Sequence, residues 1–285
     1  MTLEPLRDTI ARHGLDARKA LGQHFLLDLH LTARIAALAG DLTGRHVLEV
    51  GPGPGGLTRA LLATPAADIT AVEIDRRAVG AIRELAEADG RLRIIEGDAL
   101  AMDLPSLVPT PRAVIANLPY NVATPLFVGW LRQAAQWERL TLMFQLEVAE
   151  RICAAPGSAE YGRLAVLAQW TGTAAILTRI PPAAFWPPPK VVSAVIGFVP
   201  HASQPTAALF ATMERVTAAA FGQRRKMLRG SLRALGGADL LNEAGIAPDR
   251  RAETLDIAEF DRLARLVEAQ AAPPAPSPVL HNEQP

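Results

Sequence analysis

Residues Asn117, Leu118, Pro119 and Tyr120 stand together in the stretch I-A-N-L-P-Y-N and could act on a planar amine. The nitrogen of such an amine is a poor nucleophile, because its lone pair is delocalised into the ring. The Asn117 side-chain oxygen and the Leu118 carbonyl could accept its two N–H groups and localise the lone pair toward an incoming methyl group. Pro119 removes a competing donor, and Tyr120 offers a flat face for a base. Such chemistry depends on positioning, which contributes up to roughly 7–11 kcal/mol; the alternative is an ordinary turn that leaves a strand.

A glycine-rich loop lies upstream, in V-L-E-V-G-P-G-P-G-G-L-T at 47–58. Glycines 51, 53 and 56 match the G-x-G-x-x-G of dinucleotide-binding loops, and glycines 51, 53 and 55 match the looser G-x-G-x-G of methyltransferases. Glu73 follows Gly51 by 22 residues, where its carboxylate could accept both ribose hydroxyls of a nucleotide. NAD and S-adenosylmethionine both suit this pattern, and Glu49 with the two prolines between the glycines favours S-adenosylmethionine.

Asp98, in the stretch E-G-D-A-L, is expected directly after a strand. A carboxylate at that place could accept a hydrogen bond from an adenine amino group. Asp is equally typical of a helix N-cap or a turn, so both interpretations stay open.

A basic segment lies between Arg215 and Gly237. The whole chain balances 29 basic against 29 acidic residues, but this segment has six basic residues and no acidic one, so the remainder has 29 − 6 = 23 basic against 29 acidic. The spacing predicts a helix with Arg225, Arg229 and Arg233 on one face and an apolar stripe of Leu228, Leu232 and Leu235 on another. A basic face can be merely solvated, but here we predict that it binds RNA phosphates, through Arg224, Arg225, Lys226, Arg229 and Arg233.

The composition restricts the class of protein. The 285 residues are 49% apolar and 20% charged, which predicts a large buried core. No run of eighteen apolar residues and no signal-type N-terminus is present, so we expect a cytoplasmic protein that does not enter membranes. Cys153 is the only cysteine and the six histidines show no ligand spacing, so we expect neither a disulfide nor a metal site.

The elements that must position these residues alternate between strands and helices. Short apolar, β-rich runs occur at 47–50, 69–74, 92–95, 113–117 and 140–144, and segments with helical spacing occur at 57–63, 76–88, 122–136 and 160–171. This alternation predicts βαβ units around a parallel sheet. Strands at 173–178 and 191–199 should pair antiparallel, because the loop between them is too short for a crossover helix.

We therefore predict an α/β fold with a mostly parallel seven-stranded sheet that has one reversed strand near its edge. The sequence indicates a catalytic domain over 1–203 and a small all-helical, RNA-contacting domain over 204–270. The Pro/Ala-rich tail at 271–285 is expected to be disordered.

The order of these motifs resembles the ribosomal RNA adenine dimethyltransferases, and within them the bacterial small-subunit branch. The resemblance runs from about residue 12 to 268. Besides the loop, Glu73, Asp98 and N-L-P-Y, it is carried by these stretches: K-A-L-G-Q-H-F-L (19–26), Q-L-E-V-A-E-R (145–151), Y-G-R-L-A-V-L-A-Q (161–169), F-W-P-P-P-K-V-V-S-A-V (185–195) and F-G-Q-R-R-K-M-L-R-G-S-L (221–232).

The resemblance implies a class I methyltransferase fold that uses S-adenosylmethionine and no metal. It implies cofactor contacts at His24, Leu26, Gly51, Gly53, Glu73, Asp98 and Asn117. Tyr120 and Phe185 would flank the target adenine, although Phe185 in its Pro-rich loop could equally fill the core. The implied substrate is two adjacent adenines in the 3′-terminal hairpin of 16S rRNA, within the immature small ribosomal subunit, and we expect a monomer when free.

Three departures from the family pattern are His24, where many members have Asn, Leu146 in place of a Lys, and Gly222 in place of an Asn. The last two leave the details of ribosome contact open. Two alternatives remain: a large-subunit adenine methyltransferase, which the stretches at 161–166 and 221–226 disfavour, and a ribosome-assembly factor with secondary catalysis.

Overall fold

The computed structural model describes residues 4–15, 23–223 and 226–271. Contacts divide the chain into two compact units, Met1–Gln204 and Pro205–Pro285, and each unit is described by itself. The expected tail at 271–285 lies outside the described residues except for Ala271. No helix in the described ranges has the length and apolar character needed to cross a membrane.

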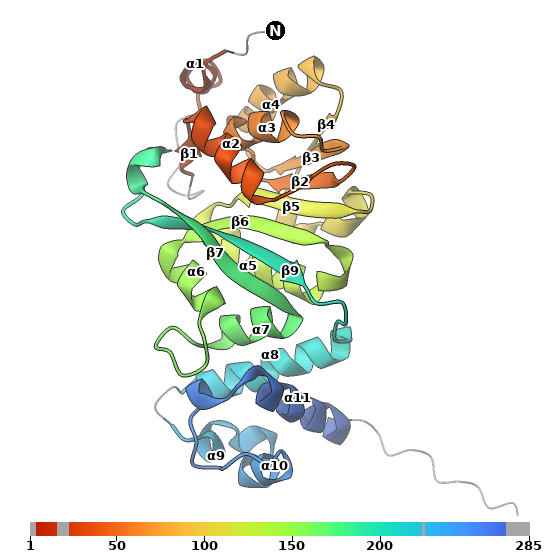
Figure 1. Cartoon of the computed structure of the whole chain (residues 1–285), viewed down its shortest axis with the longest axis vertical. Coiled ribbons are helices and arrows are strands. Elements are labelled where there is room, and N and C mark those ends of the chain that lie inside the picture. The colour runs from red at the N-terminus through yellow and green to blue at the C-terminus, as the bar shows by residue number, and fades with distance from the viewer. Residues whose placement is uncertain (1–3, 16–22, 224–225, 272–285) are drawn as a thin grey trace, which may run out of the picture. The chain divides into compact units, whose positions relative to one another are not determined.

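Among the described residues of the first unit, seven strands form one sheet in the order β4-β3-β2-β5-β6-β9-β7 (Figure 1). Its strands are β2 (His46–Val50), β3 (Asp68–Glu73), β4 (Leu92–Glu96), β5 (Arg112–Asn117), β6 (Arg139–Gln145), β7 (Gly172–Ile180) and β9 (Ser193–Pro200). Only β9 runs antiparallel, pairing with β6 on one side and with β7 on the other. The predicted seven-stranded, mostly parallel sheet with one reversed strand beside its edge is therefore confirmed. Its central strands β2, β3 and β5 are buried on both faces, as strands covered by helices must be.

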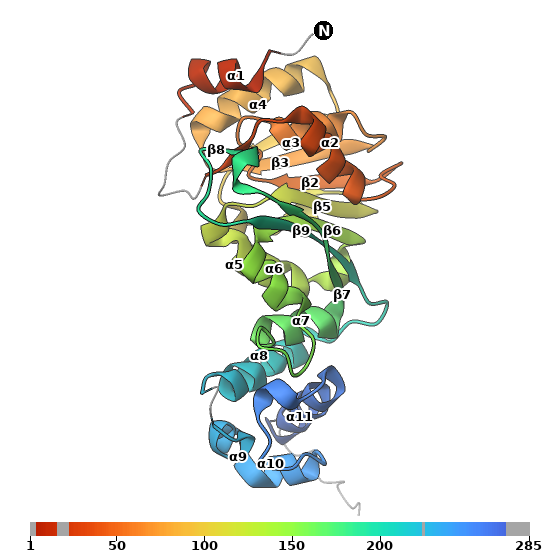
Figure 2. The ribbon, with the colours of Figure 1, turned by 60° about the vertical axis from the view of Figure 1, so that its left-hand side comes forward.

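The helices of this unit separate the strands along the chain. They are α1 (Leu6–Arg12), α2 (Leu29–Leu38), α3 (Gly56–Leu62), α4 (Arg76–Ala88), α5 (Tyr120–Arg132), α6 (Leu146–Cys153) and α7 (Arg163–Thr171). Helix α1 lies beside α4 (Figure 2), where Arg12 is ion-paired with Glu84. Asp28 and Asp75 cap α2 and α4, because each side chain accepts a hydrogen bond from the first turn. The helix expected over 122–136 is α5, which begins two residues earlier, at Tyr120, and ends at Arg132.

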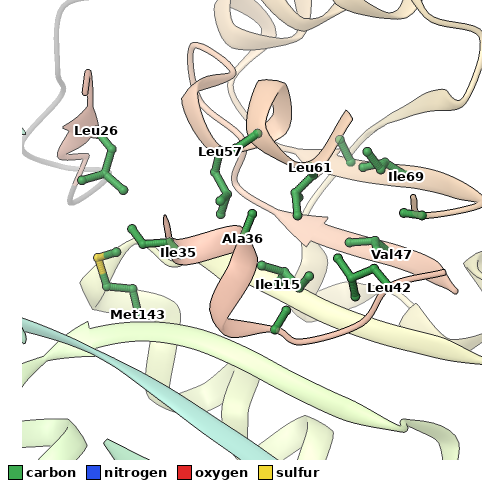
Figure 3. Packing of buried hydrophobic residues seen from close by; sticks show 14 of the residues in the cluster. Leu26, Ile35, Ala36, Leu42, Val47, Leu57, Leu61, Ile69, Ile115 and Met143 are labelled. Atoms are coloured by element: carbon green, nitrogen blue, oxygen red, sulfur yellow. The ribbon is translucent and has the colours of Figure 1, made fainter. Parts of the chain in front are cut away.

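The core of the first unit lies between α2, α3 and the central strands (Figure 3). Ile35 and Ala36 of α2 and Leu57 and Leu61 of α3 belong to one buried cluster that also includes these strand residues: Val47, Ile69 and Ile115. Burial of apolar surface of this kind contributes roughly 25 cal/mol per Å². This packing holds the carboxyl ends of β2, β3 and β5 in a constant relation to one another.

A second, two-stranded sheet joins β1 (Phe25–Leu26) to β8 (Phe185–Trp186). The strands are antiparallel, with Phe25 opposite Trp186 and Leu26 opposite Phe185. This pairing was not predicted, because two-residue strands carry no periodicity. It joins two segments of the first unit that are about 160 residues apart in the sequence.

The second unit is helical, as expected. It contains α8 (Ala207–Phe221), α9 (Leu228–Ser231), α10 (Gly237–Glu243) and α11 (Ile257–Ala271), with 3₁₀ turns at Arg233–Leu235 and Ala252–Thr254. Helices α8 and α11 pack together, with Phe221 stacked on Phe260 at a ring-centroid distance of 5.6 Å.

The predicted continuous basic helix through Arg225, Arg229 and Arg233 is wrong. Lys226 lies in a bend, Met227 has extended backbone angles, and only four residues, Leu228–Ser231, form α9. The reason is long-range: the N–H groups of Leu228 and Arg229 donate to the carbonyls of Arg250 and Pro248 instead of to a preceding helical turn. The apolar stripe is kept in part, since Leu228 and Leu232 are buried.

Candidate functional site

A cavity of about 200 Å³ opens at the carboxyl ends of β2, β3, β4 and β5 and is closed on one side by β1. In open parallel sheets this edge is where ligands bind. Its lining includes every residue predicted to contact the cofactor (His24, Leu26, Gly51, Gly53, Glu73, Asp98 and Asn117) together with Leu118, Pro119 and Tyr120. Phe185, by contrast, is not among the lining residues.

The glycine loop forms one wall of this cavity. It leaves β2 after Val50 and enters α3 at Gly56. Gly51 and Gly53 have φ angles of 70° and 56°, which favour glycine. A Cβ at Gly51 would lie 3.2 Å from the ring of Pro119, and one at Gly53 would lie 3.1 Å from the ring of Phe25. The loop therefore needs glycine because it closely approaches both the N-L-P-Y turn and β1.

Glu73 is the last residue of β3, and only 4% of it is exposed. One carboxylate oxygen accepts a hydrogen bond from the N–H of Gly53 at 3.1 Å, and the other accepts from the N–H of Asp75 at 2.8 Å. Burial raises the pKa of Glu73, and these backbone donors partly oppose that rise. Each carboxylate oxygen keeps acceptor capacity, so the side chain both ties the glycine loop to β3 and can accept a ligand's hydroxyl groups.

Glu49 of β2 also lines the cavity and is 1% exposed. The Thr58 hydroxyl donates to its carboxyl group at 2.7 Å. Burial raises the pKa of Glu49 to about 8, while the Thr58 bond lowers it and the charge of Glu73 raises it further. A buried carboxyl group that stays mostly protonated near neutral pH thus lies in the wall of the cavity.

Asp98 lines the cavity and also caps a 3₁₀ turn at Ala99–Ala101, where it accepts from the N–H of Leu100 at 2.9 Å. The capping interpretation is therefore observed, and a contact with an adenine amino group stays a prediction. The unpredicted lining residues include two exposed apolar side chains, Ile74 and Leu100, which are 58% and 48% exposed. Each follows an acidic residue of the cavity closely in sequence, a signal that could have identified them as apolar surfaces for a nucleoside base.

The N-L-P-Y turn links β5 to α5. Asn117 ends β5, and its Nδ2 donates to the His24 carbonyl at 3.3 Å. Because a carbonyl can only accept, this bond orients the amide with Oδ1 free, and Oδ1 has no partner among the described residues. Tyr120 begins α5, and its hydroxyl pairs with the Ser193 hydroxyl at 2.6 Å. Burial raises the Tyr120 pKa, so the phenol stays neutral.

Phe185 is 4% exposed and belongs to the same buried cluster as Leu26 and Val195. Its ring meets the His24 ring edge-on, with centroids 6.5 Å apart and planes at 78°. The position agrees with the alternative that Phe185 fills the core. A role beside the target base requires its ring to turn toward the cavity and stays a prediction.

The predicted RNA-binding residues are in the second unit. Lys226, Arg229 and Arg233 are exposed, and Arg224 and Arg225 lie outside the described residues. Within the described part of the chain, no group of three or more His, Cys, Asp or Glu side chains is arranged to hold a metal ion.

The cavity has what an adenosyl cofactor needs. Glu73 offers acceptors for a ribose diol, Asp98 an acceptor for an amino group, Ile74 and Leu100 apolar faces for a base, and Asn117 an unused acceptor at the other end. Together with the strand order and the single reversed strand, this site identifies the chain as a class I methyltransferase.

Comparisons with known proteins define the family. The family model described as Ribosomal RNA adenine dimethylase matches residues 14–269. Ribosomal RNA small subunit methyltransferase A of Gluconobacter oxydans (strain 621H) is 67% identical over 267 residues, covering 93% of this chain and 88% of the relative. The protein of the same name from Paramagnetospirillum magneticum (strain ATCC 700264 / AMB-1) is 55% identical, covering 94% of this chain and 96% of the relative.

Two solved structures are similar over most of the chain. A dimethyladenosine transferase from Plasmodium falciparum has a TM-score of 0.73 and 25% identity, covering 84% of this chain and 96% of its own. The 23S rRNA methyltransferase ErmE has a TM-score of 0.65 and 27% identity, covering 86% and 99%. The chain belongs to the ribosomal RNA adenine dimethylase family. It is an rRNA adenine methyltransferase, and its family and fold imply the use of S-adenosylmethionine.

Proposed function

We propose that this protein dimethylates the exocyclic amino groups of two adjacent adenines in the 3′-terminal hairpin of 16S rRNA, in the immature small ribosomal subunit. The observation that carries the proposal is the orientation of Asn117, whose Oδ1 is free at the end of a cavity suited to an adenosyl cofactor. The relatives named small subunit methyltransferase A are 67% and 55% identical, against 27% for the 23S rRNA enzyme, which favours the small subunit as substrate.

S-Adenosylmethionine would supply an electrophilic methyl group on a sulfonium. His24, Leu26, Gly51, Gly53, Glu73 and Asp98 would hold it, with Glu73 at the ribose and Asp98 at the adenine. The apolar surfaces of Ile74 and Leu100 would cover the base and exclude water from it.

The substrate amine would be held by Asn117 Oδ1 and the Leu118 carbonyl, each accepting one N–H group. This orients the lone pair without removing a proton in advance, so no strong base is needed. Tyr120 presents the face of a neutral ring to the adenine, and base–aromatic stacking contributes about 1–3 kcal/mol. That contribution would help to offset the few kcal/mol needed to extrude a base.

The basic residues of the second unit would bind the RNA backbone. Lys226, Arg229 and Arg233 are exposed there, and Arg224 and Arg225 are close in sequence. Binding that rests on phosphate contacts should weaken steeply as salt rises. We further propose that the protein acts in the cytoplasm as a monomer when free and without a metal ion.

Mass spectrometry of 16S rRNA from cells that lack this protein is the direct test. We expect both adenines to lose all methylation and to regain it when the gene is restored. In vitro, labelled cofactor should mark immature small subunits and leave naked large-subunit RNA unmarked. Labelling of the large-subunit RNA alone would overturn the proposal.

A further inference from the structure

His24 makes hydrogen bonds on both sides of the substrate end of the cavity. Its main-chain carbonyl accepts from Asn117 Nδ2 at 3.3 Å. Its ring atom Nδ1 lies 2.7 Å from the carbonyl oxygen of Pro187. Since that oxygen can only accept, Nδ1 carries the proton and donates. A single residue therefore contacts both the amide that would hold the amine and the segment that contains Phe185.

The β1–β8 pairing explains why a side chain is needed here. Phe25 pairs with Trp186 and Leu26 with Phe185, so the next position in the register sets His24 opposite Pro187. Proline has no N–H and cannot donate to the ladder. The His24 carbonyl accepts from Asn117 Nδ2 in place of such a donor, and the His24 imidazole donates to the Pro187 carbonyl, which extends the two-residue ladder by one position.

The His24 ring also contacts the two aromatic residues at this end of the cavity. Its centroid is 5.4 Å from that of Tyr120, with the planes tilted by 33°, and 6.5 Å from that of Phe185. Tyr120 is held in turn by Ser193, which is fully buried. The position of the imidazole thus affects both rings that could flank a base.

We propose that His24 is a positioning residue for the substrate base, and that its side chain acts by holding the Phe185–Pro187 segment against the cavity. The inference rests on the proposed function, and it gives the side chain a role in addition to the cofactor contact proposed above. The bond to Asn117 comes from the main chain and survives any substitution. Replacing the side chain therefore tests the tether to Pro187 separately from the orientation of Asn117.

Two variants separate the hydrogen bond from ring packing. His24→Phe keeps a flat ring against Tyr120 and Phe185 but removes the donor. His24→Asn restores a side-chain N–H without the ring. His30→Phe is the matched control, because His30 is an exposed histidine in the first turn of α2.

Cofactor affinity would be measured by titration calorimetry with S-adenosylmethionine, and kcat and KM with undermethylated small subunits. A third readout, independent of activity, is acrylamide quenching of Trp186, which is 39% exposed, whereas Trp130 and Trp137 are 1% and 4% exposed and Trp170 is partly buried. A parallel set of variants in a Trp186→Phe background isolates the signal of this residue.

For His24→Phe we expect increased quenching of Trp186 and, at saturating cofactor, a kcat/KM for the subunit lowered by about threefold to tenfold, as for loss of one hydrogen bond. His24→Asn should recover part of both effects, and His30→Phe should show neither. Weaker cofactor binding with unchanged quenching would overturn the inference, as would the absence of any change. If the wild type does not methylate small subunits, the proposed function fails, and the quenching of His24→Phe alone still decides whether the tether exists.

Discussion

The two ends of the cavity are built in different ways. At the cofactor end, the glycine loop, Glu73 and Asp98 lie at the carboxyl ends of adjacent strands of one sheet, and the Glu73 carboxylate accepts from two backbone N–H groups. At the substrate end, a side-chain bond of Tyr120 to Ser193 and one of His24 to Pro187, with a two-residue ladder, hold the rings; the His24 bond and the ladder join segments more than 150 residues apart. The first end is thus rigid because of the fold, whereas the second depends on a few contacts that single substitutions can remove.

The largest expected effect is that of Asn117→Ala, which removes the only side-chain acceptor proposed for the amine. We expect kcat to fall by about 10²–10⁴-fold, because positioning and preorganised acceptors lower the activation barrier by an amount of that size. Cofactor affinity should change far less. Labelled methyl transfer to undermethylated small subunits measures the loss, with Asn242→Ala on the exposed face of α10 as control.

Asn117→Asp sharpens this test. It keeps the side-chain oxygens but cannot donate to the His24 carbonyl, so an active Asn117→Asp would show that the orienting bond is unnecessary. Full activity of Asn117→Ala would refute the proposed role of the amide.

The second-largest effect is expected for Glu73→Gln, which acts at the cofactor end of the cavity. The amide keeps one acceptor oxygen where the carboxylate serves two backbone N–H groups, so cofactor affinity should fall by about tenfold or more. Glu96→Gln is a close control, because Glu96 pairs with Glu73 in the β3–β4 register but is exposed. Calorimetry with S-adenosylmethionine would measure both, and equal losses would show that Glu73 has no special role.

The raised pKa of Glu49 predicts that the free energy of unfolding depends on pH. Its pKa is about 8 in the folded protein, whereas in the unfolded chain it has its ordinary value of 4.5. The folded state therefore holds a proton that the unfolded chain has released, and the stability that this proton provides is fully present below pH 4.5 and is lost as the pH rises toward 8. The loss is on the order of 1 kcal/mol per pH unit.

Urea unfolding between pH 5 and 8 checks this prediction. Glu49→Gln keeps an acceptor for Thr58 and should show a flatter pH dependence than the wild type, with its advantage greatest at pH 8. Glu96→Gln should follow the wild type. Parallel curves for Glu49→Gln and the wild type would contradict the raised pKa.

The smallest expected effect is that of the Tyr120–Ser193 hydrogen bond. Ser193→Ala and Tyr120→Phe should each lower the free energy of unfolding by about 1 kcal/mol, because each leaves the other hydroxyl without its partner. The double variant should lose little more than either single one. Urea unfolding of all four proteins gives the coupling, and strictly additive losses would mean that the bond contributes nothing.

The cofactor end could be predicted from the sequence, and the substrate end only in part. Parallel strands end at one edge of a sheet, so the motifs at Gly51, Glu73, Asp98 and Asn117 had to meet once the strands were identified. The β1–β8 pairing and the burial of Phe185 depend on long-range packing that no local pattern records. The broken basic helix has the same cause, since distant carbonyls took the N–H groups of its first turn.

All residues that line the cavity lie between Gln23 and Leu126 in the chain, whereas β8 and Ser193 come much later. During synthesis from the N-terminus, every residue that would hold the cofactor is therefore available well before the residues that complete the substrate end. An emerging chain therefore has the cofactor-holding residues and the N-L-P-Y turn before it has the segments that pack against His24 and hold Tyr120.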